Sequence, residues 1–330
     1  SALGAEGREF ESRRSDHCLK DLQHRVASPF CFGVPIALPM LLASLAIVSQ
    51  VGLRLLMASW RFVLMALCCV TKSKSLSAPA AHLARLGVVD ALRGSAMVWM
   101  TVFHFCFDLS HFGYWSQNFR VDPVWTLQRT VIVSLFLLCA GLGQSVAIHQ
   151  GQSWGRFGRR WMQVAACALL VTLGSWAMFP RSFIYFGVLH GMAAMLPLVR
   201  ATAAWRRWLW LAGGVALALP WMAHAALTGP LVDWAVYFNA RSLNWLGLVS
   251  HKPFTEDYVP LLPWLGVMWW GMAAGNWLLE HRPQWLHVRL PVGLQGLAVL
   301  GRWSLSYYML HQPVLIGLLL LWGVMSGHGA

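Results

Sequence analysis

Charged side chains are scarce in this chain of 330 residues. Only 11% of its positions are charged, whereas about 25% is usual for a soluble domain. Acidic residues number just 12, and hydrophobic residues make up 58% of the sequence. A chain with so little charge cannot cover a folded surface with polar groups. This composition excludes an ordinary water-soluble protein, and it indicates that part of the solvent around the protein is lipid.

The motifs of several enzyme classes are also missing. The sequence has no nucleophilic serine elbow and no phosphate-binding glycine loop. Its 7 cysteines show neither zinc-site spacing nor a disulfide framework, since Cys106, Cys139 and Cys167 lie in apolar runs and Cys68 is adjacent to Cys69. We therefore expect free buried thiols and no metal. The formal charge of +13 does not predict nucleic-acid binding, because the basic residues stand between apolar runs.

Long apolar runs are what the sequence has in abundance. From Val88 onward, seven runs are each close to the 20 or so residues that a membrane-spanning helix needs. Backbone polar groups must be satisfied within the segment in hydrocarbon, so we predict an all-α polytopic transmembrane bundle of about seven core spans. A shorter run, Leu290–Leu300, predicts an interfacial or re-entrant helix. The predicted spans are Val88–Leu109, Thr130–Ile148, Trp161–Phe179, Phe183–Val199, Trp208–Leu227, Val259–Leu279 and about Trp303–Gly323.

Residues 1–64 differ from the rest and leave two interpretations open. The charged stretch around Phe10-Glu11-Ser12 has no helical period, and this tripeptide is what the T-arm string TTC-GAA-TCC of many tRNA genes encodes. The segment is then a reading frame extended through a neighbouring tRNA gene, with Met65 as the start. Alternatively, the apolar run Val34–Leu53 is an additional hydrophobic helix. We expect residues 65–82 to be a cytoplasmic lead-in and residues 83–325 to form one transmembrane domain.

The basic residues predict the orientation. If the first span starts in the cytoplasm, most Lys and Arg residues from Lys72 onward fall on the cytoplasmic side, as the positive-inside rule requires. The other side then holds Arg120, Arg129, Arg181, Arg241 and Lys252. The long segment Thr228–Tyr258 is predicted to lie outside.

The first predicted span is unusual because one of its faces is polar. Polar or sulfur-containing residues recur there at steps of three or four, which places them on one side of a helix. At about 1.5 Å per residue this face extends roughly 30 Å, the thickness of the hydrocarbon core. Ionisable groups at such depth usually face a functional cavity. The residues of this face are Asp90, Arg93, Met97, Thr101, His104, Asp108 and His111.

Three histidines lie inside predicted spans. His104 sits well inside the first predicted span, and Asp108, one turn on, is placed to orient its ring and raise its basicity. His190 and His311 lie at similar depth in other spans. Each could be a core histidine with its hydrogen bonds satisfied, but three together favour a shared polar cavity. For Asp90 and Arg93 the simplest interpretation is an ion pair at the interface.

Four ordered blocks carry a family resemblance. The run Leu86–Trp115 contains D-x-x-R-G with His104 eleven residues after the Arg, and it is followed by Phe186–Ala194, Asp257–Gly275 and Leu300–Pro313. These blocks resemble the heparan-alpha-glucosaminide N-acetyltransferase catalytic-domain family, including bacterial members. The resemblance covers about residues 83–322.

This resemblance implies a membrane acyltransferase. Acetyl-CoA would be used at the cytosolic side, and the acyl group would reach a sugar or glycolipid on the outer side of a bacterial inner membrane. His104 would be the general base, and for the family it stays open whether a histidine carries the acyl group covalently or acts as a base in a ternary complex. His111 is the nearest match to the lumenal histidine of the animal enzyme. Because that enzyme has Asn at the position of His104, an envelope glycan is expected rather than heparan.

The remaining site residues are assigned within this hypothesis. Asp108 joins His104 and His111 as a catalytic residue, and the acceptor would be bound by Asp90, Arg93, His190 and His311. Phosphates of CoA would be held by Arg156, Arg159 and Arg160, unless these are only topology charges. Two other functions stay open: a proton-coupled transporter or flippase of an envelope precursor, and a non-catalytic partner in an envelope-synthesis complex.

Overall fold

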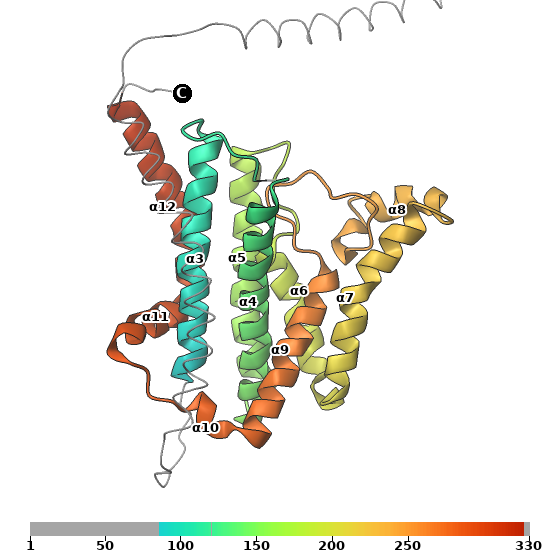
Figure 1. The fold of residues 1–330 in the computed structure, drawn as a ribbon, viewed down its shortest axis with the longest axis vertical. Coiled ribbons are helices and arrows are strands. Elements are labelled where there is room, and N and C mark those ends of the chain that lie inside the picture. The colour runs from blue at the N-terminus through green and yellow to red at the C-terminus, as the bar shows by residue number, and fades with distance from the viewer. Residues whose placement is uncertain (1–85, 120, 327–330) are drawn as a thin grey trace, which may run out of the picture. The chain divides into compact units, whose positions relative to one another are not determined.

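The structure is a computed structural model that describes residues 86–119 and 121–326. The predicted N-terminal extension and lead-in lie outside the described residues. Within them the fold is helical, and the sole β-type pairing is an isolated parallel bridge between Phe186 and Tyr258. The longer helices are α3 Gly87–His111, α4 Pro123–His149, α5 Trp154–Met178, α6 Val188–Ala201, α7 Trp208–Leu227, α9 Leu261–His281, α11 Val292–Arg302 and α12 Ser304–Met325 (Figure 1). Short helices η1 Ala203–Trp205, η2 Val232–Trp234, α8 Ala235–Asn239, η3 Asn244–Leu246 and α10 Pro283–Leu286 connect them.

Four described helices are long and apolar enough to cross a membrane: α4, α5, α7 and α12. The all-helical membrane fold is thus confirmed, but the count of seven spans stays a prediction. With 14 residues, α6 is shorter than a span needs. In α3, Asp90, Arg93, Asp108 and two histidines reduce the hydropathy, and in α9 the tryptophans and glycines have the same effect.

The predicted start of the fourth span, at Phe183, is wrong. Helix α6 begins only at Val188, because the preceding segment is extended and pairs with the segment before α9. The N–H of Glu256 donates to the carbonyl of Ser182 over 2.9 Å, and that of Val259 donates to the carbonyl of Phe186 over 3.0 Å. These bonds satisfy backbone groups that a longer α6 would have used internally.

Glycines set the closest helix contacts. A Cβ atom at Gly94 of α3 would overlap the backbone of Leu297 in α11, and one at Gly301 would overlap the backbone of Asp90. In the same way Gly141 allows α4 to reach α9. The pairs α3–α11 and α4–α9 have the most extensive helix interfaces in the described residues. Small residues at such contacts are typical of helices that associate in lipid.

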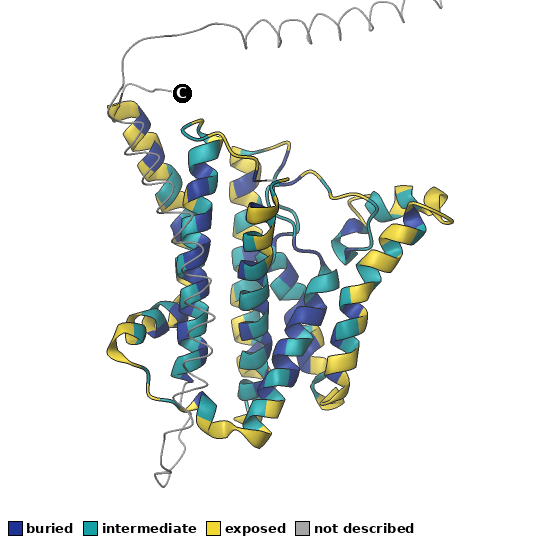
Figure 2. Cartoon of the chain, in the orientation of Figure 1, coloured by how far each residue is buried: buried dark blue, intermediate teal, exposed yellow. Residues whose placement is uncertain are grey.

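Apolar side chains remain exposed on the outer helices. Figure 2 shows buried residues concentrated in α3, α6 and α9, while α5, α7 and α12 carry long exposed stretches. Leu169, Leu173, Leu318 and Leu321 are among the exposed leucines. In water such continuous apolar faces would be unfavourable, so lipid is the solvent that fits them.

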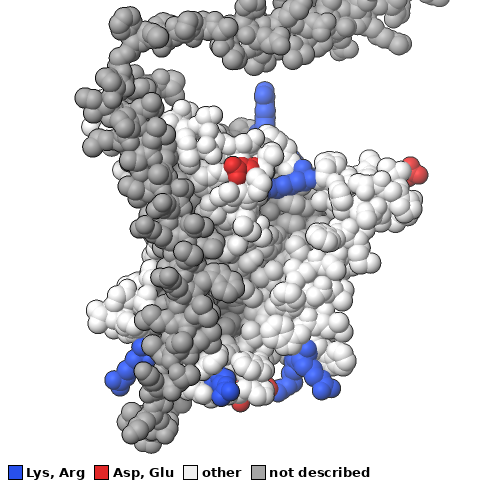
Figure 3. All heavy atoms as spheres, viewed as in Figure 1, with Lys and Arg blue, Asp and Glu red and all other residues white. Residues whose placement is uncertain are grey.

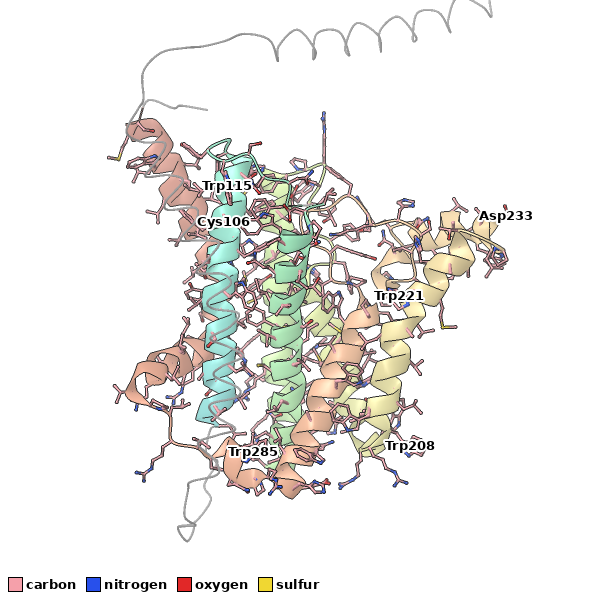
Figure 4. All side chains as sticks on the ribbon, in the orientation of Figure 1. Cys106, Trp115, Trp208, Trp221, Asp233 and Trp285 are labelled. Atoms are coloured by element: carbon pink, nitrogen blue, oxygen red, sulfur yellow. The ribbon has the colours of Figure 1, made fainter. Side chains whose placement is uncertain are left out.

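Charge and tryptophan mark the two ends of the helices. The loops that join α4 to α5, α6 to α7 and α9 to α10 lie at the same end as the start of α3. Figure 3 shows several Lys and Arg side chains at this lower end, with fewer at the upper end. In Figure 4, Trp208 and Trp285 lie near the lower end, and Trp115 lies near the upper end. Tryptophans placed so are typical of the headgroup regions.

Candidate functional site

Polar residues of α3 and α12 face each other in what we call the α3–α12 seam. It comprises Thr101, His104 and Asp108 of α3 with Tyr307, His311 and Gln312 of α12. At one level the hydroxyl oxygens of Thr101 and Tyr307 are 2.7 Å apart. At another, Gln312 donates its Nε2–H to Oδ1 of Asp108 over 2.7 Å. The polar face predicted for α3 therefore has a polar counterpart on α12.

His104 and His311 are neighbours in this seam. Their ring centroids are 5.1 Å apart, and the ring planes meet at 63°, an edge-to-face arrangement. His311 is buried and His104 is half-buried. The ring nitrogens of His104 make no hydrogen bond to the described residues. The structure thus brings together two of the three histidines for which the sequence predicted a common cavity.

The protonation pattern of His311 follows from one hydrogen bond. Its Nδ1 lies 2.7 Å from the carbonyl oxygen of Tyr308, and a carbonyl can only accept, so Nδ1 carries the proton. In a neutral ring Nε2 then has the free lone pair. This Nε2 is buried and has no hydrogen-bond partner among the described residues. His311 can therefore accept a proton or a hydrogen bond at Nε2.

Asp108 does not orient His104 as the sequence analysis expected. Its Oδ1 accepts from Gln312, while its Oδ2 is buried and has no partner among the described residues. The amide oxygen of Gln312 is likewise buried and unpartnered. Together with Nε2 of His311, three buried polar atoms of the seam have no hydrogen-bond partner in the part of the chain that the structure describes. Buried polar atoms are nearly always paired, so this concentration makes the seam a candidate site for a ligand or water.

An ion cluster stands at the other end of α3. Arg93 lies 3.5 Å from Asp90, which confirms the pair that the spacing predicted. Arg302, at the end of α11, also approaches Asp90, with 3.7 Å between its Nε and Oδ2. Asp90 is in the first turn of α3, where a negative charge is favourable. These contacts hold α11 to α3, and they leave Asp90 and Arg93 engaged with each other.

His190 has other partners. Its Nδ1 accepts the N–H of Gly187 at the start of α6, and its Nε2 lies 2.9 Å from the hydroxyl of Thr172 in α5. Both ring nitrogens are thus hydrogen-bonded within α5 and α6. Sequence reasoning placed it with His104 and His311, but the structure gives it the satisfied pattern of a core histidine.

His111 lies at the exposed end of α3. Its ring stacks on Phe107 at 6.3 Å and meets Phe179 edge-on at 5.7 Å. It is one turn beyond Asp108 and open to solvent. This position suits contact with a ligand that enters from that end.

The three arginines expected to hold CoA phosphates are exposed on the first two turns of α5. Arg156 donates to the carbonyl of Gly151 over 3.4 Å. Their spacing places Arg156, Arg159 and Arg160 on one side of the helix, where an accessible set of cations fits the chemistry of phosphate binding. It equally fits a role in setting topology.

Sequence reasoning missed Asp257 as a residue that positions α6. Its carboxylate accepts the N–H of Val188, in the first turn of α6, over 2.8 Å. A Cβ atom at Gly187 would collide with it, so glycine is required there. Desolvation raises the pKa of Asp257, while the Val188 bond and the charges of Arg129 and Lys252 act in the opposite direction. The signal was the D-Y-V-P sequence, which begins at the end of the long segment predicted to lie outside.

The fold and the seam define a helical membrane protein with a polar histidine site between two helices. Within the described residues, no three His, Cys, Asp or Glu side chains are grouped as a metal site requires. Residues 85–313 match the family model described as heparan-alpha-glucosaminide N-acetyltransferase, catalytic. No curated protein and no solved structure matches the chain.

The match spans well over half of the 330 residues. The chain therefore belongs to the heparan-alpha-glucosaminide N-acetyltransferase catalytic family, and the resemblance seen in its sequence is confirmed. This places the chain in a family of membrane acetyltransferases. The matched region includes both sides of the α3–α12 seam.

Proposed function

We propose that this protein transfers an acetyl group from cytosolic acetyl-CoA to a hydroxyl or amine of a sugar or glycolipid on the outer side of a bacterial inner membrane. In this proposal the chain crosses the membrane about seven times, with the start of α3 in the cytoplasm. Family membership and the exposed apolar helices support it. The excess of basic residues at the lower end supports the orientation.

The observation that carries the proposal is the pairing of His104 with His311 beside buried, unpartnered polar atoms. An acyl transfer to an alcohol or amine needs a base that removes one proton as the new bond forms. The seam offers an accessible imidazole, an adjacent hydrogen-bond acceptor and unsatisfied polar atoms that a substrate can satisfy. No other group of described residues combines these three properties.

His104 is the proposed general base. The carbonyl of Tyr308 fixes the proton of His311 on Nδ1, so Nε2 of His311 can accept an N–H from His104. The structure does not contain this bond; in the proposal it forms when substrate is present and leaves the second nitrogen of His104 free to take the acceptor's proton. As that proton moves to His104, the acceptor oxygen or nitrogen bonds to the thioester carbonyl carbon. The carbon–sulfur bond then breaks, and His104 returns the proton to the thiolate.

The other site residues have supporting roles in this proposal. Asp108 and Gln312 turn unsatisfied oxygens toward the substrate, and exposed His111 meets the acceptor at the outer end. His311 braces His104, and Asp90 with Arg93 holds α11 to α3 at the cytosolic end. His190 joins α5 to α6 and keeps a structural role. Acetyl-CoA supplies the acetyl group as an activated thioester, and its phosphates would meet Arg156, Arg159 and Arg160 at the cytosolic end.

The test is acceptor-dependent release of CoA. Purified protein is incubated with radiolabelled acetyl-CoA and an envelope extract, and both free CoA and the labelled product are measured. His104→Gln should lower the rate about 10²- to 10⁴-fold, because glutamine cannot take the proton. His224→Gln, which changes a histidine of α7 outside the seam, is the matched control and should keep the rate. Undiminished CoA release by His104→Gln would refute the assignment.

A proton-coupled transporter or flippase is the second candidate. The row of polar contacts along α3, from Asp90 with Arg302 to Asp108 with Gln312, favours it because a proton relay needs such a row. A transporter would also lose function in His104→Gln, but it would release no CoA. Substrate movement in vesicles without thioester cleavage would select this alternative.

A further inference from the structure

Two adjoining cavities lie at the lower end of α7 and α9, on different helices from the seam. The first has a volume of about 490 Å³ and is bounded by the α6–α7 connection, the start of α7 and the last turns of α9. Its charged lining is Arg206, Arg207 and Glu280, with His281 beside them. Four tryptophans complete it: Trp205, Trp208, Trp210 and Trp277.

The second cavity is apolar and has a volume of about 410 Å³. It follows α7 through Leu211, Val215 and Leu219, and α9 contributes its other wall. Trp205 and Trp208 line both cavities, so the two adjoin. A compartment with charged side chains at the helix end thus continues into an apolar groove along a helix that is long and apolar enough to cross the membrane.

The charges of the first cavity leave one cation available. Arg206 adopts a positive φ of 46°, which is rare for a residue with a side chain, and it forms an ion pair with Glu280. The Arg207 guanidinium instead lies over the Trp208 ring, 5.7 Å from its centroid. A cation on an aromatic face keeps its hydrogen-bond donors free for an anion. Arg207 is therefore the group that a phosphate would meet.

We propose that these cavities bind one anionic phospholipid, with its phosphate at Arg207 and an acyl chain in the groove. A phosphate would pair with the available guanidinium of Arg207. An acyl chain would fill the second cavity, which is apolar and lies along α7, a helix apolar enough to cross a membrane. A soluble phosphate compound without an acyl chain would leave that groove unfilled. Tryptophan at the boundary of the two compartments suits the level of the headgroups. The site goes beyond the proposed acyl transfer and does not depend on it.

Lipid retention by the purified full chain tests the headgroup. Phosphatidylglycerol and phosphatidylcholine with identical acyl chains are compared by native mass spectrometry and by the thermal unfolding midpoint. The wild-type protein should retain phosphatidylglycerol in preference to phosphatidylcholine, and phosphatidylglycerol should raise its unfolding midpoint. Arg207→Gln should lower this preference about fivefold, since one basic residue contributes about 1 kcal/mol to binding an anionic lipid. Arg289→Gln removes an exposed cation outside the cavities and should change nothing.

A second pair of variants tests the groove. Ala212→Trp fills the apolar cavity, whereas Ala218→Trp makes the same change at an exposed position of α7 outside it. The first should reduce phosphatidylglycerol retention, and the second should not. Equal retention of the two lipids, or equal loss in either matched pair, would overturn the proposal. Stabilisation by CoA or inorganic phosphate as strong as that by phosphatidylglycerol would identify a soluble ligand instead and would also overturn it.

Discussion

The role of His311 can be tested by two substitutions that separate the hydrogen bond of its Nδ1 from the free acceptor at its Nε2. In His311→Asn the amide nitrogen takes the place of Nδ1 and can still donate to the Tyr308 carbonyl. It no longer offers an acceptor toward His104. In His311→Gln the amide oxygen reaches the place of Nε2, so the acceptor is kept and the bond to Tyr308 is lost. Each variant removes one of the two functions of the ring.

The structure gives the expected size of each effect. If Nε2 of His311 orients His104, its loss costs a hydrogen bond of about 0.5–1.5 kcal/mol net, or roughly two- to thirteenfold in rate. For histidines that bind a metal, removal of the partner that orients the ring typically costs about 10- to 100-fold in affinity or activity. We therefore expect His311→Asn to lower kcat about 10- to 100-fold, less than His104→Gln does. His311→Gln should stay within a few fold of wild type. The KM for acetyl-CoA should change little, because orientation acts on the chemical step.

The assay is acceptor-dependent CoA release, together with the thermal midpoint of each variant. His224→Asn serves as the control for histidine loss in a helix outside the seam. A purely structural role, in which the Tyr308 bond holds α12, predicts the reverse order, with His311→Gln less active and less stable than His311→Asn. That order would refute the positioning role.

Three further predictions concern stability and are read by thermal unfolding. Desolvation raises the pKa of Asp257 in the folded protein above its ordinary value of 3.8. There is therefore a pH range in which the folded carboxyl holds its proton and the unfolded carboxyl has lost it. Stability should therefore fall as pH rises through this window, and Asp257→Asn should remove that slope. Arg200 is buried and donates to both the carbonyl and the side chain of Gln152. Arg200→Met should therefore lower the free energy of unfolding by about 1–3 kcal/mol. An unfolding midpoint equal to that of wild type would contradict a stabilising role for this contact. Gly94→Ala should destabilise by at least about 1–3 kcal/mol because of the Leu297 backbone, whereas Gly143→Ala, which has ordinary space, should not.

The helices could be predicted because hydropathy and the backbone requirement in lipid act locally. The predicted start at Trp208 and end at Leu227 agree with α7, and the polar face of the first span is present in α3. The start of α6 could not be predicted from local pattern. It depends on the pairing of the segment before it with the segment before α9; Ser182 and Glu256, for example, are 74 residues apart in the chain.

The candidate site was predictable in part. The period of α3 indicated His104 and Asp108, and depth indicated His311. The partners could not be read from the sequence, because they depend on which helix α12 packs against. Asp108 meets Gln312 rather than His104, and His190 is satisfied by Thr172. Spacing along one helix shows which residues share a face, but not which neighbour lies opposite.

The parallel course of α3 and α12 has an evolutionary consequence. Thr101 meets Tyr307 and Asp108 meets Gln312 at nearly the same separation along the chain, 206 and 204 residues, with the two histidines between them. One insertion in the first turn of α12 would rotate all of these partners away by about 100°. Among relatives, gaps should therefore be absent from this turn, and residues at these two pairs of positions should change together. Covariation in an alignment of relatives can check the register without any structure.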